Sequence, residues 1–182
     1  MTSLANRQRR LNGNNAQAMS RGFVKEDDLE HAGTDLPERQ LSTHPNYVTE
    51  NGYAQLQQLA NDLEKSRLAL TASKDEPASQ QKLVMINRDL RYVAARLDSA
   101  LITKPDVAAL QVLFGAKVTV EDEDGTRYTY EIVGEDEVDI HANKVSWVSP
   151  LAKALIGHKV GESVIWLRPA GNVILEIIAI HY

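Results

Sequence analysis

The stretch SKDEPASQQ, residues 73–81, separates two long segments whose apolar residues recur at helical spacing. In the first segment, the positions spaced by three and four residues are Leu56, Leu59, Leu63, Ser66 and Leu70. In the second segment, they are Leu83, Ile86, Leu90, Val93, Leu97 and Ala100. This spacing produces the narrow apolar stripe of a coiled coil, and two such helices joined by a short turn fold back antiparallel. The interruption therefore predicts an antiparallel helical hairpin.

Local signals indicate where the two helices begin and end. Thr49 precedes the first helix and is a suitable N-cap. Pro105 follows the second helix and is expected to end it, because proline lacks the N–H donor of a helix. Each helix of about 22 residues should extend roughly 33 Å, at 1.5 Å per residue. An ordinary helical bundle is the alternative, but the stripe is narrow and no other segment would cover further faces.

Two acids, Asp75 and Glu76, lie side by side in the interruption. Adjacent carboxylates on a flexible turn could bind a divalent ion weakly. They also suit the start of the second helix, where Pro77 stands and negative charge meets exposed N–H groups. Both interpretations, a weak metal site and a soluble helix start, stay open.

The segment before the hairpin, residues 1–46, is polar and has no sustained apolar period. It contains several Gly and Pro residues and cannot bury enough apolar surface to fold alone. We expect it to be a disordered arm.

Beyond Leu113 the apolar period changes to two, which is typical of strands. The strand candidates are KVTVE (117–121), RYTYEIV (127–133), KVSWVS (144–149), ESVIWLR (162–168) and VILEIIAI (173–180). Asp124-Gly125 predicts a hairpin turn between the first two. In SPLAKALIG, Ser149 can cap a short helix, Pro150 suits its first position and Gly157 can end it. The predicted fold class is α+β, a helical hairpin followed by an antiparallel sheet with one short helix.

Composition excludes several classes of function. The 182 residues are 43% hydrophobic and 25% charged, and the absence of cysteine excludes disulfides, thiolate catalysis and cysteine metal sites. The five histidines are scattered, so no zinc site is expected. No apolar run is long enough to span a bilayer, which favours a cytoplasmic protein. The net charge is −5, and the acidic segment 117–139 would repel phosphates, so we expect no direct binding to duplex DNA.

Several motifs in the second half occur in an order that is typical of one family. They are YEIVG, SPLAKALIG, VGESV, RPAG and the closing IIAIHY, and YVTENGYAQL at residues 47–56 extends the match forward. Together they resemble the Gre factors, bacterial proteins that enter the secondary channel of RNA polymerase. This resemblance covers roughly residues 47–182. It implies a coiled-coil hairpin over 47–104 and an FKBP-like C-terminal domain over 105–182.

The resemblance also implies how such a protein acts. In Gre factors the C-terminal domain docks at the channel rim, and the residues that match this contact are Val148, Ser149 and Pro150, with Val148 standing where many members have Asp or Asn. Helix capping is the alternative role for Ser149 and Pro150. The family's coil passes toward the active centre, where two carboxylates at its tip help to hold a second Mg²⁺ ion. Because the polymerase remains the catalyst, we expect that this chain is not itself an enzyme.

The tip departs from the cleavage-active members of that family. They carry a segment like Gly-Asp-x-Ser-Glu-Asn-Ala-Glu-Tyr, which is missing here, and this hairpin is about 20 residues shorter in total, or on the order of 15 Å per arm. We therefore expect a polymerase-binding regulator of elongation without transcript cleavage. A genuine cleavage factor that uses Asp75 and Glu76 is one alternative.

A prolyl isomerase or chaperone is the other alternative, because an FKBP-like domain can carry that activity. Such an enzyme needs an apolar pocket lined by several aromatic residues. The chain has only two Phe, so we do not expect such a pocket. Trp147 and Trp166 fall in predicted strands, where tryptophan more often packs in a core or at an edge than stacks on a base.

Overall fold

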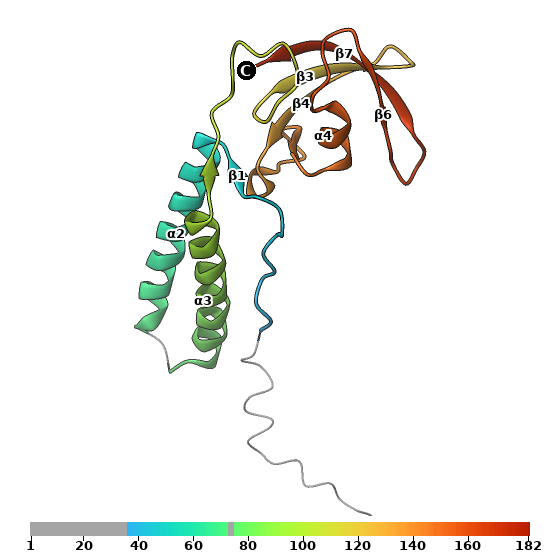
Figure 1. Cartoon of the computed structure of the whole chain (residues 1–182). Helices are drawn as coiled ribbons and strands as arrows, with labels where there is room; N and C mark the ends of the chain where they lie inside the picture. Colours follow the sequence, from blue (N-terminus) through green and yellow to red (C-terminus); the bar gives the residue numbers. More distant parts are fainter. Residues whose placement is uncertain (1–35, 73–74) are drawn as a thin grey trace, which may run out of the picture. The chain divides into compact units, whose positions relative to one another are not determined.

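The computed structural model describes residues 36–72 and 75–182. These residues form two long helices, a five-stranded sheet, a short α-helix and a pair of two-residue strands (Figure 1). The predicted α+β fold class is confirmed. The arm expected over residues 1–46 lies outside the described residues as far as residue 35, and the domain limits drawn from the sequence stay predictions.

The two long helices, α2 (Glu50–Thr71) and α3 (Pro77–Asp98), lie side by side as a hairpin (Figure 1). Each has 22 residues, which is the predicted length. Thr49 caps α2 as predicted, because its Oγ1 atom accepts the N–H of Gly52 at 2.9 Å. The hairpin is therefore an outcome of local sequence signals.

The packed face of α2 differs from the stripe predicted above, in which both Leu59 and Ser66 turn out to be exposed. Leu56 is buried in one apolar cluster with Val93 of α3, and Tyr53, Ala60 and Leu63 pack against that cluster. Leu59 is 44% exposed, so its predicted place in the stripe is wrong. The contacting face of α2 alternates three, four and three residues from Tyr53, and a stripe drawn through leucines alone misses this phase.

The second helix ends earlier than predicted. Its last residue is Asp98, and the N–H of Ser99 donates to the carbonyl of Ala95 at 3.1 Å. The next residues form β2 (Leu101–Ile102), which pairs in parallel with β1 (Tyr47–Val48). Pro105 therefore does not end the helix, because pairing with β1 has already drawn the chain into an extended conformation.

The five predicted strands all form. The sheet has the order β5-β4-β3-β7-β6, and its strands are β3 (Lys117–Asp122), β4 (Arg127–Val133), β5 (Lys144–Ser146), β6 (Ser163–Trp166) and β7 (Val173–His181). Three of its pairings are antiparallel, but β4 and β5 are parallel, so the sheet is mixed. A parallel pair needs a crossover connection, which here contains the 3-10 helix η1 (Glu135–Glu137).

The short helix α4 (Pro150–Leu155) completes the core of the sheet domain. Its residues Leu151, Ala152 and Leu155 are buried in the cluster that also contains buried residues of β3, β4, β6 and β7. Gly157 has a φ of 89° just after the helix, which confirms the predicted left-handed ending. Gly125 has a φ of 78°, as the predicted β3–β4 turn requires.

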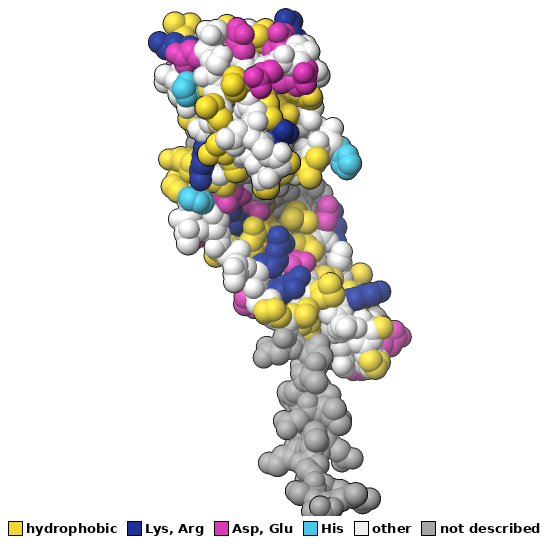
Figure 2. Space-filling view, turned by 90° about the vertical axis from the view of Figure 1, so that its right-hand side faces the viewer, with side chains coloured by type: hydrophobic (Ala, Val, Ile, Leu, Met, Phe, Trp, Pro, Cys, Tyr) yellow, Lys and Arg dark blue, Asp and Glu magenta, His cyan; other side chains and the backbone are white. Residues whose placement is uncertain are grey.

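The surface of the sheet domain carries acidic side chains, several of which are visible on the face shown in Figure 2. Within residues 36–72 and 75–182, no helix combines the length and the apolar character needed to cross a lipid bilayer.

Candidate functional site

The predicted contact residues Val148, Ser149 and Pro150 form the turn from β5 into α4. The Oγ atom of Ser149 accepts the N–H of Ala152 at 3.2 Å, and Pro150 occupies the first helical position. The N–H of Val148 donates to the Oγ atom of Ser146 at 3.3 Å. The capping role of Ser149 and Pro150 is therefore confirmed, whereas their contact with a partner stays a prediction.

The base of this turn is held in place by the core. The apolar face of α4 is buried, and the N–H of Trp147 donates to the carbonyl of Val133 in β4 at 2.9 Å. Val148 and Ser149 are half-buried, and Pro150 is exposed. A rigid turn with one exposed apolar residue is a surface that can bind without losing much conformational entropy.

Trp147, next to the turn, lies among aromatic rings from the segment that precedes α2. The ring centres of Trp147 and Tyr47 are 5.1 Å apart, and those of Trp147 and His44 are 6.0 Å apart. Trp147 and Trp166 are both partly buried against the core, as predicted, although Trp147 lies in the turn just after β5 and only Trp166 lies in a strand. The aromatic packing thus ties residues 44–47 to the predicted docking turn.

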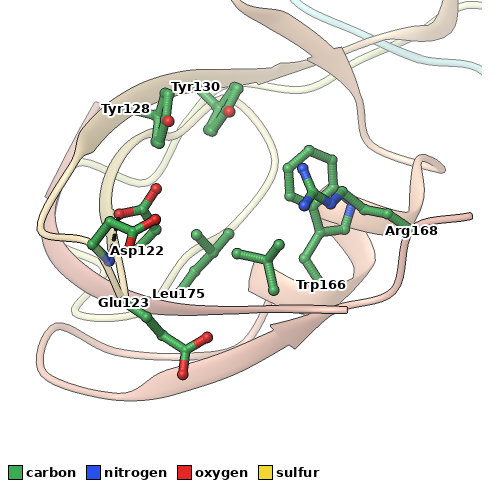
Figure 3. Close-up of a pocket in the computed structure, with 9 residues that line it drawn as sticks. Asp122, Glu123, Tyr128, Tyr130, Trp166, Arg168 and Leu175 are labelled. Carbon is green, nitrogen blue, oxygen red and sulfur yellow. Dashed lines mark hydrogen bonds between the residues drawn. The ribbon is translucent and has the colours of Figure 1, made fainter. Parts of the chain in front are cut away.

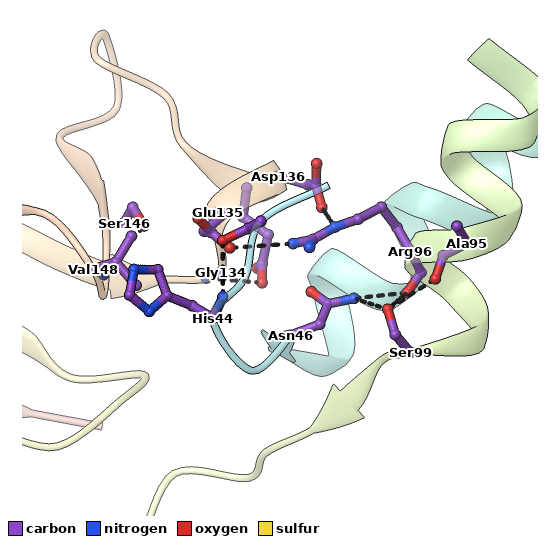
Figure 4. A network of polar contacts seen from close by, with 12 residues as sticks. His44, Asn46, Ala95, Arg96, Ser99, Gly134, Glu135, Asp136, Ser146 and Val148 are labelled. Atoms are coloured by element: carbon purple, nitrogen blue, oxygen red, sulfur yellow. Dashed lines mark hydrogen bonds and ion pairs between the residues drawn. The ribbon is translucent and has the colours of Figure 1, made fainter. Parts of the chain in front are cut away.

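A buried ion pair joins the helical hairpin to the sheet domain (Figure 4). The Arg96 side chain of α3 is 3% exposed, and its Nε atom lies 2.5 Å from Oδ2 of Asp136. Its Nη2 atom lies 3.7 Å from Oε2 of Glu135. The hydroxyl of Tyr92 donates to Oδ1 of Asp136 at 2.7 Å. Burial, followed by the hydrogen bond to Asp136, raises the pKa of Tyr92.

A third acid of η1, Glu137, binds the start of α2. Its carboxylate accepts the backbone N–H of Thr49 at 2.9 Å and that of Gly134 at 3.2 Å, and it also bonds the Thr49 hydroxyl. A side chain at Gly52 would overlap this carboxylate, so glycine is needed there. We call these contacts the junction network, which consists of Thr49, Tyr92, Arg96, Glu135, Asp136 and Glu137. Sequence reasoning treated its three acids as part of an acidic surface.

The predicted tip acids lie at the start of α3. Asp75 and Glu76 are both exposed, and Glu76 is the N-cap residue, although its side chain makes no capping hydrogen bond. Its carbonyl accepts the N–H groups of Ser79 and Gln80 at 2.9 and 3.0 Å. Negative charge thus lies at the positive end of the helix dipole, as the capping interpretation expects. Residues 73 and 74 of the interruption lie outside the described residues.

Binding of a metal at this tip stays a prediction. In the part of the chain that the structure describes, no three His, Cys, Asp or Glu side chains gather closely enough to hold a metal ion. Magnesium prefers oxygen ligands and usually keeps several waters, so the two exposed carboxylates would need further ligands from a partner.

The sheet domain also has an aromatic-lined cavity of about 370 Å³. Its aromatic residues are Tyr128, Tyr130 and Trp166, and Leu175 lies at its base. Several aromatic residues therefore do line one cavity, because two Tyr and one Trp meet although the chain has only two Phe. Asp122, Glu123, Asp124 and Arg168 line the same cavity, so it is not the apolar pocket that a prolyl isomerase needs.

Comparisons with known proteins find one family model and several relatives that match this chain. The family model "Transcription elongation factor, GreA/GreB, C-term" matches residues 108–182. The transcription elongation factor GreB of Neisseria meningitidis is 38% identical over 105 residues, which cover 57% of this chain and 64% of GreB, less than two thirds of its length. The transcription elongation factor GreA of Syntrophotalea carbinolica is 32% identical over 151 residues, which cover 74% of this chain and 96% of GreA.

A solved structure, that of GreA factor homolog 1 from Thermus thermophilus, is also similar to this chain. It is 27% identical, and the match covers 76% of this chain and all of the homologue, with a TM-score of 0.37.

These relatives correct one expectation drawn from the sequence. We expected that this chain is not itself an enzyme, and the relatives contradict that expectation, because several of them are named transcription elongation factor GreA.

Proposed function

Because this chain belongs to the GreA/GreB family of transcription elongation factors, we propose that it binds RNA polymerase at the secondary channel and acts there on transcription elongation. The sheet domain docks at the channel rim, and the helical hairpin enters the channel. Polymerase is a cytoplasmic partner, so the proposal includes a cytoplasmic location.

Docking is assigned to the turn formed by Val148, Ser149 and Pro150. The turn is fixed by the cap of α4 and by the buried face of that helix, which supports its use as a preorganised contact. Val148 replaces the polar residue common in the family, so the contact lacks one charge-assisted hydrogen bond and is weaker than in such members.

The hairpin carries Asp75 and Glu76 into the channel. Each helix has 22 residues, which corresponds to about 33 Å at 1.5 Å per residue. Both tip acids are exposed, so their carboxylate oxygens are available to a magnesium ion that the polymerase holds. In this scheme the acids assist transcript cleavage by the polymerase. The proposal thus takes the alternative named in the sequence analysis in place of a regulator without cleavage, because relatives of this chain are named GreA.

The observation that best supports this proposal is the junction network. A probe that must reach a fixed point inside a channel has to be held firmly by the part that docks. Buried Arg96 with Asp136, together with Glu137 on Thr49, supplies such a connection between hairpin and sheet domain.

Binding is tested by retention of core RNA polymerase on the tagged full chain. We expect retention by the natural sequence and stronger retention by Val148→Asp, which restores an acid at the docking turn. Val138→Asp is the matched control, because Val138 is an exposed valine of the same domain that lies outside the turn. No retention by the natural sequence would remove the proposal. If Val148→Asp and Val138→Asp changed retention equally, the assignment of docking to this turn would be wrong, but binding to the polymerase would stand.

The tip is tested by cleavage of the transcript in stalled elongation complexes. The variant Asp75→Ala/Glu76→Ala should lose stimulated cleavage and keep polymerase retention. The control Asp62→Ala/Glu64→Ala removes one exposed and one half-buried acid from the middle of α2 and should keep both properties. Unchanged cleavage by the tip variant would show that these carboxylates have no part in the reaction.

A further inference from the structure

The aromatic-lined cavity lies on the sheet domain, between the β3–β4 turn and the strands β6 and β7 (Figure 3). Its residues fall into three chemical groups, which are aromatic, aliphatic and charged. The aliphatic group consists of Val173 and Leu175, and Leu175 is buried. The cavity, of about 370 Å³, has room for one long side chain and its neighbouring backbone.

The three aromatic rings form a continuous wall. The rings of Tyr128 and Tyr130 are stacked, with centres 6.2 Å apart and planes inclined by 21°. The ring of Trp166 meets Tyr130 edge-on, with centres 6.5 Å apart. Faces of Tyr and Trp carry partial negative charge and attract cations within about 6 Å of the ring centre.

A cation already lies on this wall. The guanidinium carbon of Arg168 is 4.9 Å from the centre of the Trp166 ring (Figure 3). Arg168 is exposed, and its Nε atom donates to the carbonyl of Gly171 at 3.3 Å. It forms no ion pair with any residue that the structure describes, so its guanidinium is held weakly and can move away.

The opposite end of the cavity is acidic. Asp124 in the β3–β4 turn is exposed, and its carboxylate meets no cation among the described residues. The neighbouring Glu123 is also exposed, but its carboxylate points away from the aromatic rings (Figure 3). The turn itself is held by Asp122, whose Oδ1 atom accepts the N–H groups of Asp124 and Thr126 at 3.1 and 2.8 Å. Unpaired negative charge therefore stands at a defined place beside the aromatic wall.

We propose that this cavity binds a Lys or Arg side chain of a partner protein. The aliphatic stem packs on Val173 and Leu175, and the cationic group lies between the aromatic wall and Asp124 of the turn. Arg168 occupies the wall until the partner's side chain replaces it. Nucleic acid is a poor occupant, because its phosphates would be repelled by Glu123 and Asp124.

The test is a nuclear magnetic resonance titration of the full chain with the blocked peptide Gly-Ser-Arg-Ser-Gly. We expect the indole N–H signal of Trp166 to shift and reach saturation, while that of Trp147, which lies outside the cavity, stays in place. The same peptide with Gln in place of Arg should leave both signals unchanged. High salt should weaken the response, because one end of the site is charged and exposed.

Three variants probe the assigned roles. Arg168→Gln should tighten binding of the Arg peptide by about two- to fivefold, because an exposed cation–π contact no longer competes. Glu123→Gln/Asp124→Asn should weaken binding by a similar factor, about two- to fivefold, as exposed ion pairs do. The control Asp98→Asn removes an exposed charge at the end of α3 and should have no effect.

Several results would overturn the proposal. One is an equal response to the Arg and Gln peptides, and another is weaker binding after Arg168→Gln. A larger response to Gly-Ser-Pro-Ser-Gly would instead identify a proline-binding pocket. None of these outcomes depends on whether the chain binds polymerase.

Discussion

Replacing Asp136 by alanine should lower the free energy of unfolding and weaken the coupling between the helical hairpin and the sheet domain. Asp136 holds buried Arg96 at 2.5 Å and accepts the Tyr92 hydroxyl at 2.7 Å. Removing one partner of a buried ion pair costs about 3–5 kcal/mol. The Asp136 side chain is 14% exposed and Glu135 stays 3.7 Å from Arg96, so we expect a smaller loss of about 2–4 kcal/mol in the free energy of unfolding.

The measurement is urea unfolding followed by circular dichroism and by tryptophan fluorescence. With a slope of about 2 kcal/mol per M, the midpoint should fall by roughly 1–2 M. The circular dichroism signal reports mainly the helices, and both tryptophans lie in the sheet domain. The helical signal should be lost first in the variant, because the network no longer couples the two parts.

The control for this experiment is Asp98→Ala. It removes an exposed acid from the end of α3, close in sequence to Arg96, and Asp98 is not part of the junction network. A double-mutant cycle with Arg96→Met should give a coupling free energy of about 1–3 kcal/mol between Arg96 and Asp136. A change below about 0.5 kcal/mol for Asp136→Ala, which is typical of surface substitutions, would refute the reasoning.

Three further predictions concern local contacts. Gly52→Ala should lower the melting temperature, because its methyl group would overlap the Glu137 carboxylate, and the usual gain of about 0.5–1 kcal/mol for Ala in a helix would contradict this. Ser149→Ala should cost about 1 kcal/mol in urea unfolding, whereas Ser149→Asp should keep most of the cap. The free energy of unfolding should be constant from neutral pH to about pH 10 and then fall. Burial raises the pKa of Tyr92 and of Tyr182 above the ordinary value of 10.0, so the folded state binds these two protons more tightly than the unfolded state. This contribution is lost as the hydroxyls ionise in the folded protein. Tyr182→Phe should reduce that fall and cost about 1–2 kcal/mol at neutral pH, because the hydroxyl donates to Gln111 at 2.6 Å and accepts from Leu113 at 3.0 Å.

Two errors of the sequence interpretation have the same origin. Leu59 was placed in the apolar stripe, and Pro105 was expected to end α3, because each is the strongest local signal of its kind. In the fold, Tyr53 and Ala60 set the phase of α2, and pairing of Leu101 with Tyr47 ends the helical path early. For residues other than proline, helix preferences differ by about 1 kcal/mol or less, so tertiary contacts decide the phase and the end of a helix.

The pattern of neighbouring residues in the sequence was sufficient to predict the helices and strands. The spacing of apolar residues predicted α2, α3 and all five strands of the sheet, and single residues marked their ends, such as Thr49, Ser149 and Gly157. These features depend on neighbours within a few positions, where the period and the caps are visible in the sequence itself.

The contacts between the elements were decided only by the tertiary structure. Arg96 meets Asp136 across 40 positions, and Glu137 meets Thr49 across 88. The cavity likewise unites Tyr128 on β4 with Trp166 on β6, two strands that β3 and β7 separate in the sheet. No periodicity relates residues so far apart, because the distance between them is set by how the strands pair and how the helices pack. An acid in a charged run therefore has the same sequence signature whether it faces water or holds a buried arginine.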